Sequence, residues 1–218
     1  MNITRNLTTL ITVYLLLPAC HQPKNSNSIK GLIIDPGIKQ EAEKHIENLK
    51  EFDSVDNRMA IYKNAIFLDA FENDSLIFSS IDTPKKVLFK SFYLWRKDTL
   101  MIDGGIGLFG TVGFGINISK DSVTLYHMLS SDEIPGYAYR EKDSLEFRLQ
   151  VPCTDTKIIL SEIPDSTKSQ IIYGYVEFKS TNYFESDGQQ DGQEQLPRKK
   201  MRSNMKIYFK SSRLSLQP

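Results

Sequence analysis

Apolar and polar residues alternate along much of the chain, with the two-residue period that turns one face of a β-strand towards a core. The segment 145–151 reads Leu-Glu-Phe-Arg-Leu-Gln-Val, and in 112–118 Val, Phe, Ile and Ile alternate with Gly, Gly and Asn. Similar patterns predict further strands at 87–95, 99–102, 123–125, 158–163, 170–180 and 205–210. The chain is therefore expected to be mainly β.

Four short segments between these strands share one sequence form. Each has Asn or Lys, then Asp, then Ser or Thr, then an aliphatic residue, and their first positions, 73, 97, 120 and 142, differ by 24, 23 and 22. Asp and Ser hydrogen-bond their own backbone in tight turns, so the segments indicate hairpin turns that recur once per two strands. The alternative is that the even spacing arises by chance from common turn residues, and in that case each segment still predicts a turn.

Strands and turns together predict an antiparallel meander of about 9–11 strands, more than one flat sheet holds comfortably, which closes into a barrel or a two-sheet sandwich. One N-terminal amphipathic helix is expected over 36–52, because Asp35 and Pro36 form a helix start and apolar residues follow at helical spacing. Residues 59–71 fit a helix or a strand, and we expect helix in the early part and strand in the late part.

The N-terminal residues have a different pattern. Residues 1–19 carry one charged side chain, Arg5, followed by an apolar stretch at 10–17 that reads Leu-Ile-Thr-Val-Tyr-Leu-Leu-Leu. This pattern is typical of a cleavable signal peptide. A membrane-spanning helix needs about 20 mostly apolar residues, so the stretch is too short to serve as a permanent anchor.

The signal ends in Leu17-Pro18-Ala19-Cys20, which resembles the lipobox of bacterial lipoproteins, with Pro18 as a departure from the residues more usual there. The resemblance implies cleavage before Cys20 and attachment of lipid to this cysteine, with fatty acids such as palmitate as the membrane anchor. The residue after Cys20 is His21 and not Asp, and in this the chain resembles bacterial lipoproteins that are sorted to the outer membrane. The alternative is an ordinary secretory signal with a cysteine nearby by chance.

The remaining chain is expected to form one domain. Residues 20–34 are interpreted as a lipidated flexible tether, and 35–218 as a single β-rich domain that begins with the helix. The polar stretch at about 185–203 is expected to be a mobile loop before a final strand. This design, a helix before a β meander, is similar to that of lipocalin-like lipoproteins, a likeness of pattern without a shared motif.

The charges and the cysteines of the chain indicate which binding partners and disulfides are expected. The chain has 27 basic and 27 acidic residues, and removing residues 1–19, with Arg5 as their one charge, leaves 26 against 27. The charges are interspersed, so no nucleic-acid partner is expected, and the basic cluster 198–202 is interpreted as part of a solvated loop. With Cys20 acylated, Cys153 has no partner for a disulfide and is interpreted as a small half-buried residue.

Motifs of known chemistry are incomplete. The segment 105–110, Gly-Ile-Gly-Leu-Phe-Gly, matches a dinucleotide fingerprint by letter, but a strand pattern follows it instead of a helix, so we expect a loop or bulged strand with close backbone contacts. The three histidines, at 21, 45 and 127, lack metal-ligand spacing, and neither a metal nor a cofactor is expected. Because no nucleophile motif or carboxylate pair stands out, no catalytic residue is assigned.

One strand is apolar or aromatic on both faces. Tyr173 and Tyr175 lie on the opposite face from Ile172, which makes them candidate ligand contacts. Tyr137 and Tyr139 are candidates of the same kind. The alternative is a central strand that the N-terminal helix covers or that lines a sandwich.

The function favoured by these features is a noncatalytic lipoprotein of the cell envelope that binds a small ligand or an envelope partner through its β domain. The protein is expected to attach to the membrane through the lipid on Cys20. Two alternatives remain: an envelope hydrolase acting on glycan or peptide, and a structural or adaptor protein that pairs through a sheet edge.

Overall fold

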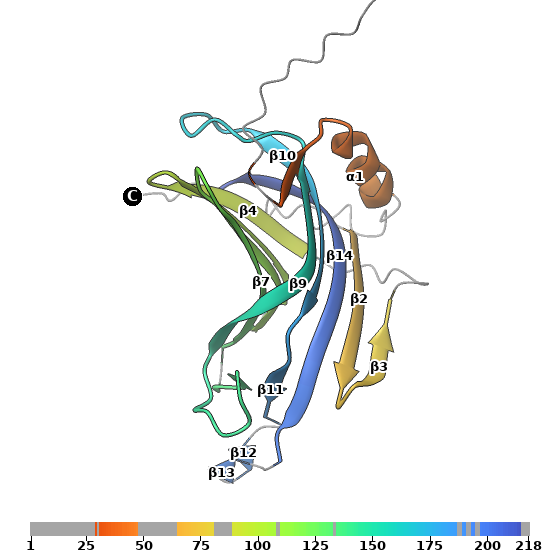
Figure 1. Cartoon of the computed structure of the whole chain (residues 1–218), viewed down its shortest axis with the longest axis vertical. Coiled ribbons are helices and arrows are strands. Elements are labelled where there is room, and N and C mark those ends of the chain that lie inside the picture. Colours follow the sequence, from red (N-terminus) through yellow and green to blue (C-terminus); the bar gives the residue numbers. More distant parts are fainter. Residues whose placement is uncertain are drawn as a thin grey trace, which may run out of the picture.

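The computed structural model describes residues 29, 31–47, 65–80, 89–107, 110–132, 134–186, 189–190, 193–194 and 197–214 (Figure 1). The described chain is mainly β with one helix, α1 (Ile38–Glu47), as the sequence predicts. The strands are β1 (Leu32–Ile34), β2 (Ala65–Glu72), β3 (Ser75–Ser79), β4 (Phe89–Arg96), β5 (Thr99–Ile106), β6 (Gly110–Ile118), β7 (Val123–Ser131), β8 (Tyr137–Ala138), β9 (Arg148–Leu160), β10 (Ile171–Ser180), β11 (Tyr183–Glu185), β12 (Gln189–Gln190), β13 (Gln193–Glu194) and β14 (Lys199–Arg213).

Seven of the described strands form a closed ring of hydrogen-bonded neighbours. The ring follows β4, β5, β6, β7, β9, β10 and β14 in turn. β14 returns to β4 through the pairs Ser212–Phe92 and Arg213–Tyr93. Hydrogen bonds close the ring as in a barrel, and its opposed strands pack their apolar faces together as in a sandwich. The prediction of a closed β architecture is confirmed.

The sheet is mixed, whereas the sequence predicts antiparallel neighbours throughout. β14 runs parallel to β4, and β1 runs parallel to β9. The first parallel pair follows from geometry, because a ring with an odd number of strands cannot have every neighbour antiparallel. The second involves residues 32–34, which the sequence assigns to the tether but which pair with 158–160.

The last strand joins the ring to a hairpin outside it. One edge of β14 is shared, because its residues 201–208 pair with β2 and its residues 212–213 pair with β4. β2 continues into β3, so the β2–β3 hairpin diverges from the ring (Figure 1). Residues 199–203, predicted as loop, are strand because β11 pairs with 199–201 and β2 with 201–208.

The four recurring segments all form turns. Asn73 and Asp74, with φ of 48° and 65°, join β2 to β3, and Lys97, with φ of 54°, begins the turn between β4 and β5. The segment at 120–123 joins β6 to β7, and the segment at 142–145 lies in a connection between β8 and β9. Asn73 and Asp74 have short polar side chains that tolerate the left-handed backbone of a two-residue hairpin turn, whereas no residue of 120–123 or 142–145 has a positive φ.

The predicted strands at 145–151 and 158–163 are replaced by a single strand, β9. Pro152 lacks an N–H group, but its carbonyl accepts a hydrogen bond from the Thr181 N–H at 2.9 Å. Asp155 has φ of 50° at a register shift between β9 and β10, so a bulge absorbs its turn-like geometry. β9 can therefore pair with β7 through its first half and with β10 through its second half.

Helix α1 lies within the predicted range 36–52, and its first turn is preceded by Asp35, whose Oδ1 accepts a hydrogen bond from the Gly37 N–H at 2.8 Å. Residues 48–52 and 59–64 lie outside the described residues. So do Cys20 and the signal, on which the lipoprotein prediction depends.

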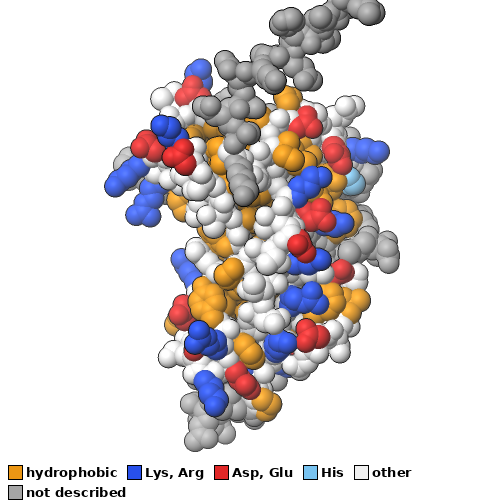
Figure 2. Space-filling view, in the orientation of Figure 1, with side chains coloured by type: hydrophobic (Ala, Val, Ile, Leu, Met, Phe, Trp, Pro, Cys, Tyr) orange, Lys and Arg blue, Asp and Glu red, His pale blue; other side chains and the backbone are white. Residues whose placement is uncertain are grey.

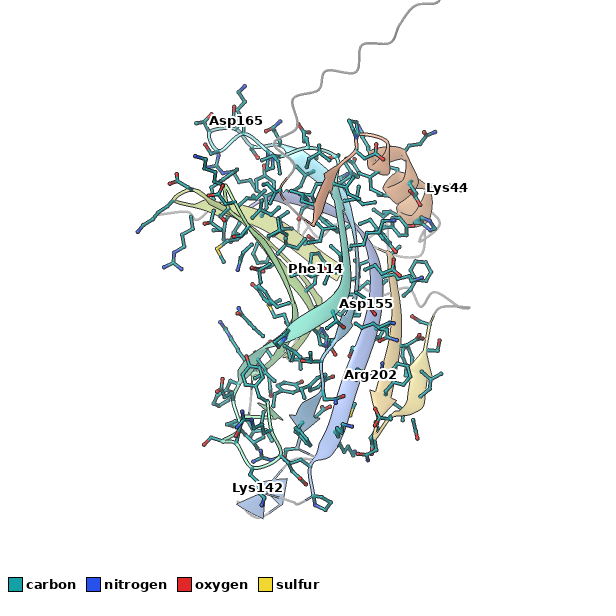
Figure 3. The ribbon with its side chains drawn as sticks, viewed as in Figure 1. Lys44, Phe114, Lys142, Asp155, Asp165 and Arg202 are labelled. Carbon is teal, nitrogen blue, oxygen red and sulfur yellow. The ribbon has the colours of Figure 1, made fainter. Side chains whose placement is uncertain are left out.

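The interior of the ring is filled by side chains. Phe114, which Figure 3 labels, and Phe209 come from opposite sides of the ring, and their ring centres lie 5.1 Å apart. Both side chains are fully buried. Burying a large apolar side chain stabilises the fold by about 1.5–3 kcal/mol. Other large side chains less than 2% exposed include those of Tyr93, Leu100, Ile102, Ile116, Leu129, Leu149, Leu160, Ile172, Phe178, Met205 and Ile207.

Candidate functional site

Helix α1 lies across the outer face of β10 and β14 and covers two of the candidate tyrosines (Figure 1). Tyr173 and Tyr175 are only 8% and 7% exposed. The ammonium groups of Lys39 and Lys210 lie 5.4 and 5.8 Å from the centre of the Tyr173 ring. Both tyrosines therefore pack beneath the helix, which is the alternative left open by the sequence, and they are not accessible ligand contacts.

A third tyrosine on this face fixes the helix. The Tyr208 hydroxyl donates a hydrogen bond to Glu41 Oε1 at 2.8 Å, and the His45 ring stacks on Tyr208 with a centroid distance of 4.1 Å. The apolar side of the helix is buried, with Ile38 and Ala42 at 3% and 0% exposure. Glu41 and His45 thus both serve the contact between helix and sheet.

The other candidate tyrosines lie at the opposite end of β14. Tyr137 is on β8, which pairs with β11 beside the start of β14, whereas β10 begins beside the end of β14. Tyr137 is half-buried against the Leu149 cluster, and the Tyr139 hydroxyl donates to the Gln150 carbonyl at 3.0 Å. The structure therefore does not bring the two tyrosine pairs into one site.

A groove of about 290 Å³ crosses the outer face of β9, β10, β14 and β2. It adjoins the end of α1, where the His45 ring meets the Phe67 ring at 6.0 Å, and Asp155 marks its β9 side (Figure 3). Acidic and basic side chains are interspersed over the visible surface around it (Figure 2). The lining residues are Phe67, Asp69, Asp155, Glu177, Phe178, Lys179, Asn204, Met205 and Lys206.

Two ion pairs connect neighbouring strands of the groove. Lys179 Nζ lies 2.9 Å from Asp155 Oδ2, and Lys206 Nζ lies 3.3 Å from Glu177 Oε1. Glu177 also accepts a hydrogen bond from the Tyr175 hydroxyl at 2.8 Å. Burial acts to raise the pKa of Glu177, but the hydrogen bonds from Tyr175 and Lys206 outweigh it and lower the pKa. Glu177 therefore stays ionised at neutral pH, unlike the general acid of a hydrolase.

One side-chain oxygen of Asp69 and one of Asn204 in the groove lack a hydrogen-bond partner among the described residues. The two residues are direct neighbours across β2 and β14. Oδ1 of Asp69 and Oδ1 of Asn204 are buried, and neither accepts a hydrogen bond within the described part of the chain. An unpaired buried polar group costs about 1–3 kcal/mol. A bound molecule that supplies O–H or N–H groups would recover this cost.

The sequence did not identify these groove residues. Asp69 is the one charged residue in the otherwise apolar segment 65–71. A charged residue in an apolar strand can mark a position with polar contacts, and this is the signal that the sequence offered. Asn204 comes 135 residues later, directly after the segment interpreted as a loop. Pairing of β2 with β14 brings the two side chains together, and single-strand periodicity carries no information about such pairing.

The strands of the ring carry one fully buried histidine and one half-buried cysteine. His127 is 0% exposed, and its Nδ1 lies 2.8 Å from the Gly113 carbonyl oxygen, to which it donates as the protonated ring nitrogen. Its Nε2 is buried without a partner among the described residues, and burial lowers the pKa of His127 to about 4 although the bond to Gly113 acts to raise it. Burial raises the pKa of the Cys153 thiol to about 12, so this thiol stays protonated and unreactive.

The glycines at 105–110 belong to the β5–β6 hairpin. A Cβ at Gly105 would lie 2.1 Å from Thr111 Cγ2, and a Cβ at Gly107 would lie 1.6 Å from the Gly110 oxygen. The close approach of chain segments expected here is confirmed. The segment leads into strand β6, so it lacks the helix N-terminus that would bind a pyrophosphate.

Within the described ranges, no helix has the length and apolar character needed to cross a membrane. In the same part of the chain, no group of three or more His, Cys, Asp or Glu side chains is placed to hold a metal ion. Comparison with known proteins found no matching family model, no matching curated protein and no matching solved structure.

Proposed function

We propose that this protein is a noncatalytic lipoprotein of the cell envelope, anchored in the outer membrane by lipid on Cys20, whose β domain binds a small polar ligand. The ligand site is the groove, and the observation that carries the proposal is the pair of buried oxygens, Oδ1 of Asp69 and Oδ1 of Asn204, that have no hydrogen-bond partner among the described residues. Because side chains fill the interior of the ring, the outer face is the surface that supports binding.

The groove has the properties of a preformed site. Its lining combines six charged or polar side chains with the Phe67 ring and with the edges of two core residues, Phe178 and Met205, which suits a polar ligand. All of these residues lie on strands, and the two ion pairs hold the lysine side chains in place. A site on strands loses little conformational entropy on binding, which favours affinity for a small molecule.

Lipidation can be tested directly. In cells supplied with labelled palmitate, the wild-type chain is expected to incorporate the label, and Cys20→Ser is expected to remain unlabelled, since residue 20 would carry the lipid. Cys153→Ser is the matched control and is expected to keep full labelling, because Cys153 is half-buried in the sheet. An unlabelled wild-type chain, or a labelled Cys20→Ser chain, would show that the anchor is assigned wrongly.

Ligand binding is tested by screening small polar compounds for an increase in the melting temperature of the purified chain. A compound that binds the groove is expected to bind Asp69→Ala about tenfold more weakly, because the variant removes a charge-assisted hydrogen bond of about 1.4 kcal/mol. Asp121→Ala, an exposed aspartate in the β6–β7 turn, is the control and should bind as the wild type does. Equal affinity in the Asp69 variant, or no binding compound, contradicts the proposal.

A second candidate function, an adaptor that pairs through a sheet edge, is favoured by β3. Among the described strands β3 pairs with β2 alone, and its Leu76 and Ile77 are 56% and 54% exposed. A strand edge with exposed apolar side chains can accept a strand from another chain. If the groove binds no compound, crosslinking in intact cells at this edge is the next experiment.

A further inference from the structure

We infer that the groove binds a neutral saccharide, an inference that rests on the proposed function and specifies its ligand. The starting point is the hydrogen-bonding character of the Asp69–Asn204 pair. Two buried acceptor oxygens without partners in the described part of the chain favour a ligand that brings donors. The Asn204 amide can turn about its last bond and present its oxygen or its NH₂ group, so the pair can engage two adjacent hydroxyl groups that both donate and accept.

The charges of the groove argue against an anionic ligand. The lining contains three carboxylates, of Asp69, Asp155 and Glu177, and two ammonium groups. Lys179 and Lys206 are each already paired with one of these carboxylates. Among the described residues, an added anion would therefore face the Asp69 carboxylate, which has no ion pair there, with no free lining cation to offset it.

A cation is the competing ligand. Three carboxylates against two ammonium groups leave the described lining with one net negative charge, on Asp69, which a cation would also meet. A saccharide is favoured because its hydroxyl groups donate to the Asp69 carboxylate while its C–H groups pack on the Phe67 ring. The cationic probe of the experiment below separates the two ligands.

An aromatic ring supplies the apolar contact that a sugar needs. Phe67 packs edge-to-face against His45 at 6.0 Å and against Tyr208 at 6.5 Å, which holds its ring in place beside the groove. One face of a pyranose presents mainly C–H groups, which pack on such a ring while the hydroxyl groups point towards polar partners. The volume of about 290 Å³ is at the lower end of small-molecule sites and suits one or two sugar rings.

The test uses the full chain, extracted in a detergent that has neither a sugar nor an amine headgroup. Maltose, cellobiose, lactose and diacetylchitobiose are titrated by calorimetry, with 1,4-diaminobutane as the cationic probe. At least one disaccharide is expected to bind, and Asp69→Ala is expected to weaken it by about tenfold. Asp69→Asn keeps an acceptor oxygen without the charge, so the loss there is expected to stay within about fivefold. Asn204→Ala gives a second variant, and Asp121→Ala is the control.

The outcomes separate this inference from the proposed function. Binding of the diamine without any disaccharide, lost in both Asp69 variants, would overturn the saccharide and leave the groove as a ligand site. Binding of a disaccharide with unchanged affinity in Asp69→Ala and Asn204→Ala would overturn the groove as its location. If none of these probes and no compound of the wider screen binds, the proposed function itself fails.

Discussion

Alanine at Gly113 is expected to lower the free energy of unfolding by about 3 kcal/mol, a large effect for one methyl group. A Cβ at this position would lie 1.9 Å from the Gly104 oxygen and 2.6 Å from the Gly105 Cα. Both obstacles are backbone atoms of β5, which pairs directly with Gly113 of β6. Relief therefore requires the two strands to move apart within a closed ring, and the Gly113 carbonyl that accepts from His127 would move as well.

Urea unfolding of the purified chain measures this effect, and Gly136→Ala is the matched control. A Cβ at Gly136 would have its nearest neighbours at 4.0 Å, so the free energy of unfolding should change by no more than about 0.5 kcal/mol. Similar values for the two variants would mean that β5 and β6 are not as closely apposed as the structure has them.

The second large effect is a loss of stability in acid that His127 causes. The pKa of His127 falls from 6.5 to about 4 on folding because its ring is fully buried. Between these values the unfolded chain binds the proton and the folded chain does not. The contribution of the neutral His127 side chain to the free energy of unfolding is therefore fully present above pH 6.5. As the pH falls towards 4, about 3 kcal/mol of the free energy of unfolding is lost.

The measurement compares urea unfolding of the wild type and His127→Asn between pH 7 and pH 4. Asparagine does not titrate, and its amide can donate to the Gly113 carbonyl from nearly the position of Nδ1. The variant is expected to be less stable at pH 7, where it loses ring packing, but to lose about 3 kcal/mol less over the acid range. His45 and the carboxylates are common to both chains and cancel in the comparison, so parallel pH curves would refute the role of His127.

Local signals in the sequence were sufficient for the class of fold. The strand period in 112–118 and the turn residues at 73–74 depend on neighbouring side chains along one segment, and both predictions are confirmed. The start of α1 after Asp35 is equally local. Such signals fix what each segment can form, independently of its partner.

Predictions that depended on strand pairing were less successful. Asp155 is a turn-type residue that the sequence places between two strands, yet pairing with β10 carries β9 through it as a bulge. The residues 199–203 are too polar to predict as a strand, and pairing on both edges makes them one. Tyr173 and Tyr175 are a further example. Alternation along the strand predicted that they lie on an outer face, but the helix that buries them comes from more than 120 residues earlier in the chain.

By itself, the sequence determined a mainly β domain with one N-terminal helix and predicted a lipid anchor at Cys20. Tertiary structure decided that the ring closes through a parallel pair, that α1 covers the tyrosines, and that Asp69 and Asn204 meet in a groove. The physical reason is that alternation and turn chemistry act over a few residues, whereas β2 and β14 pair across most of the chain. The direct neighbour of an outward-facing side chain on an adjacent strand is set by that pairing.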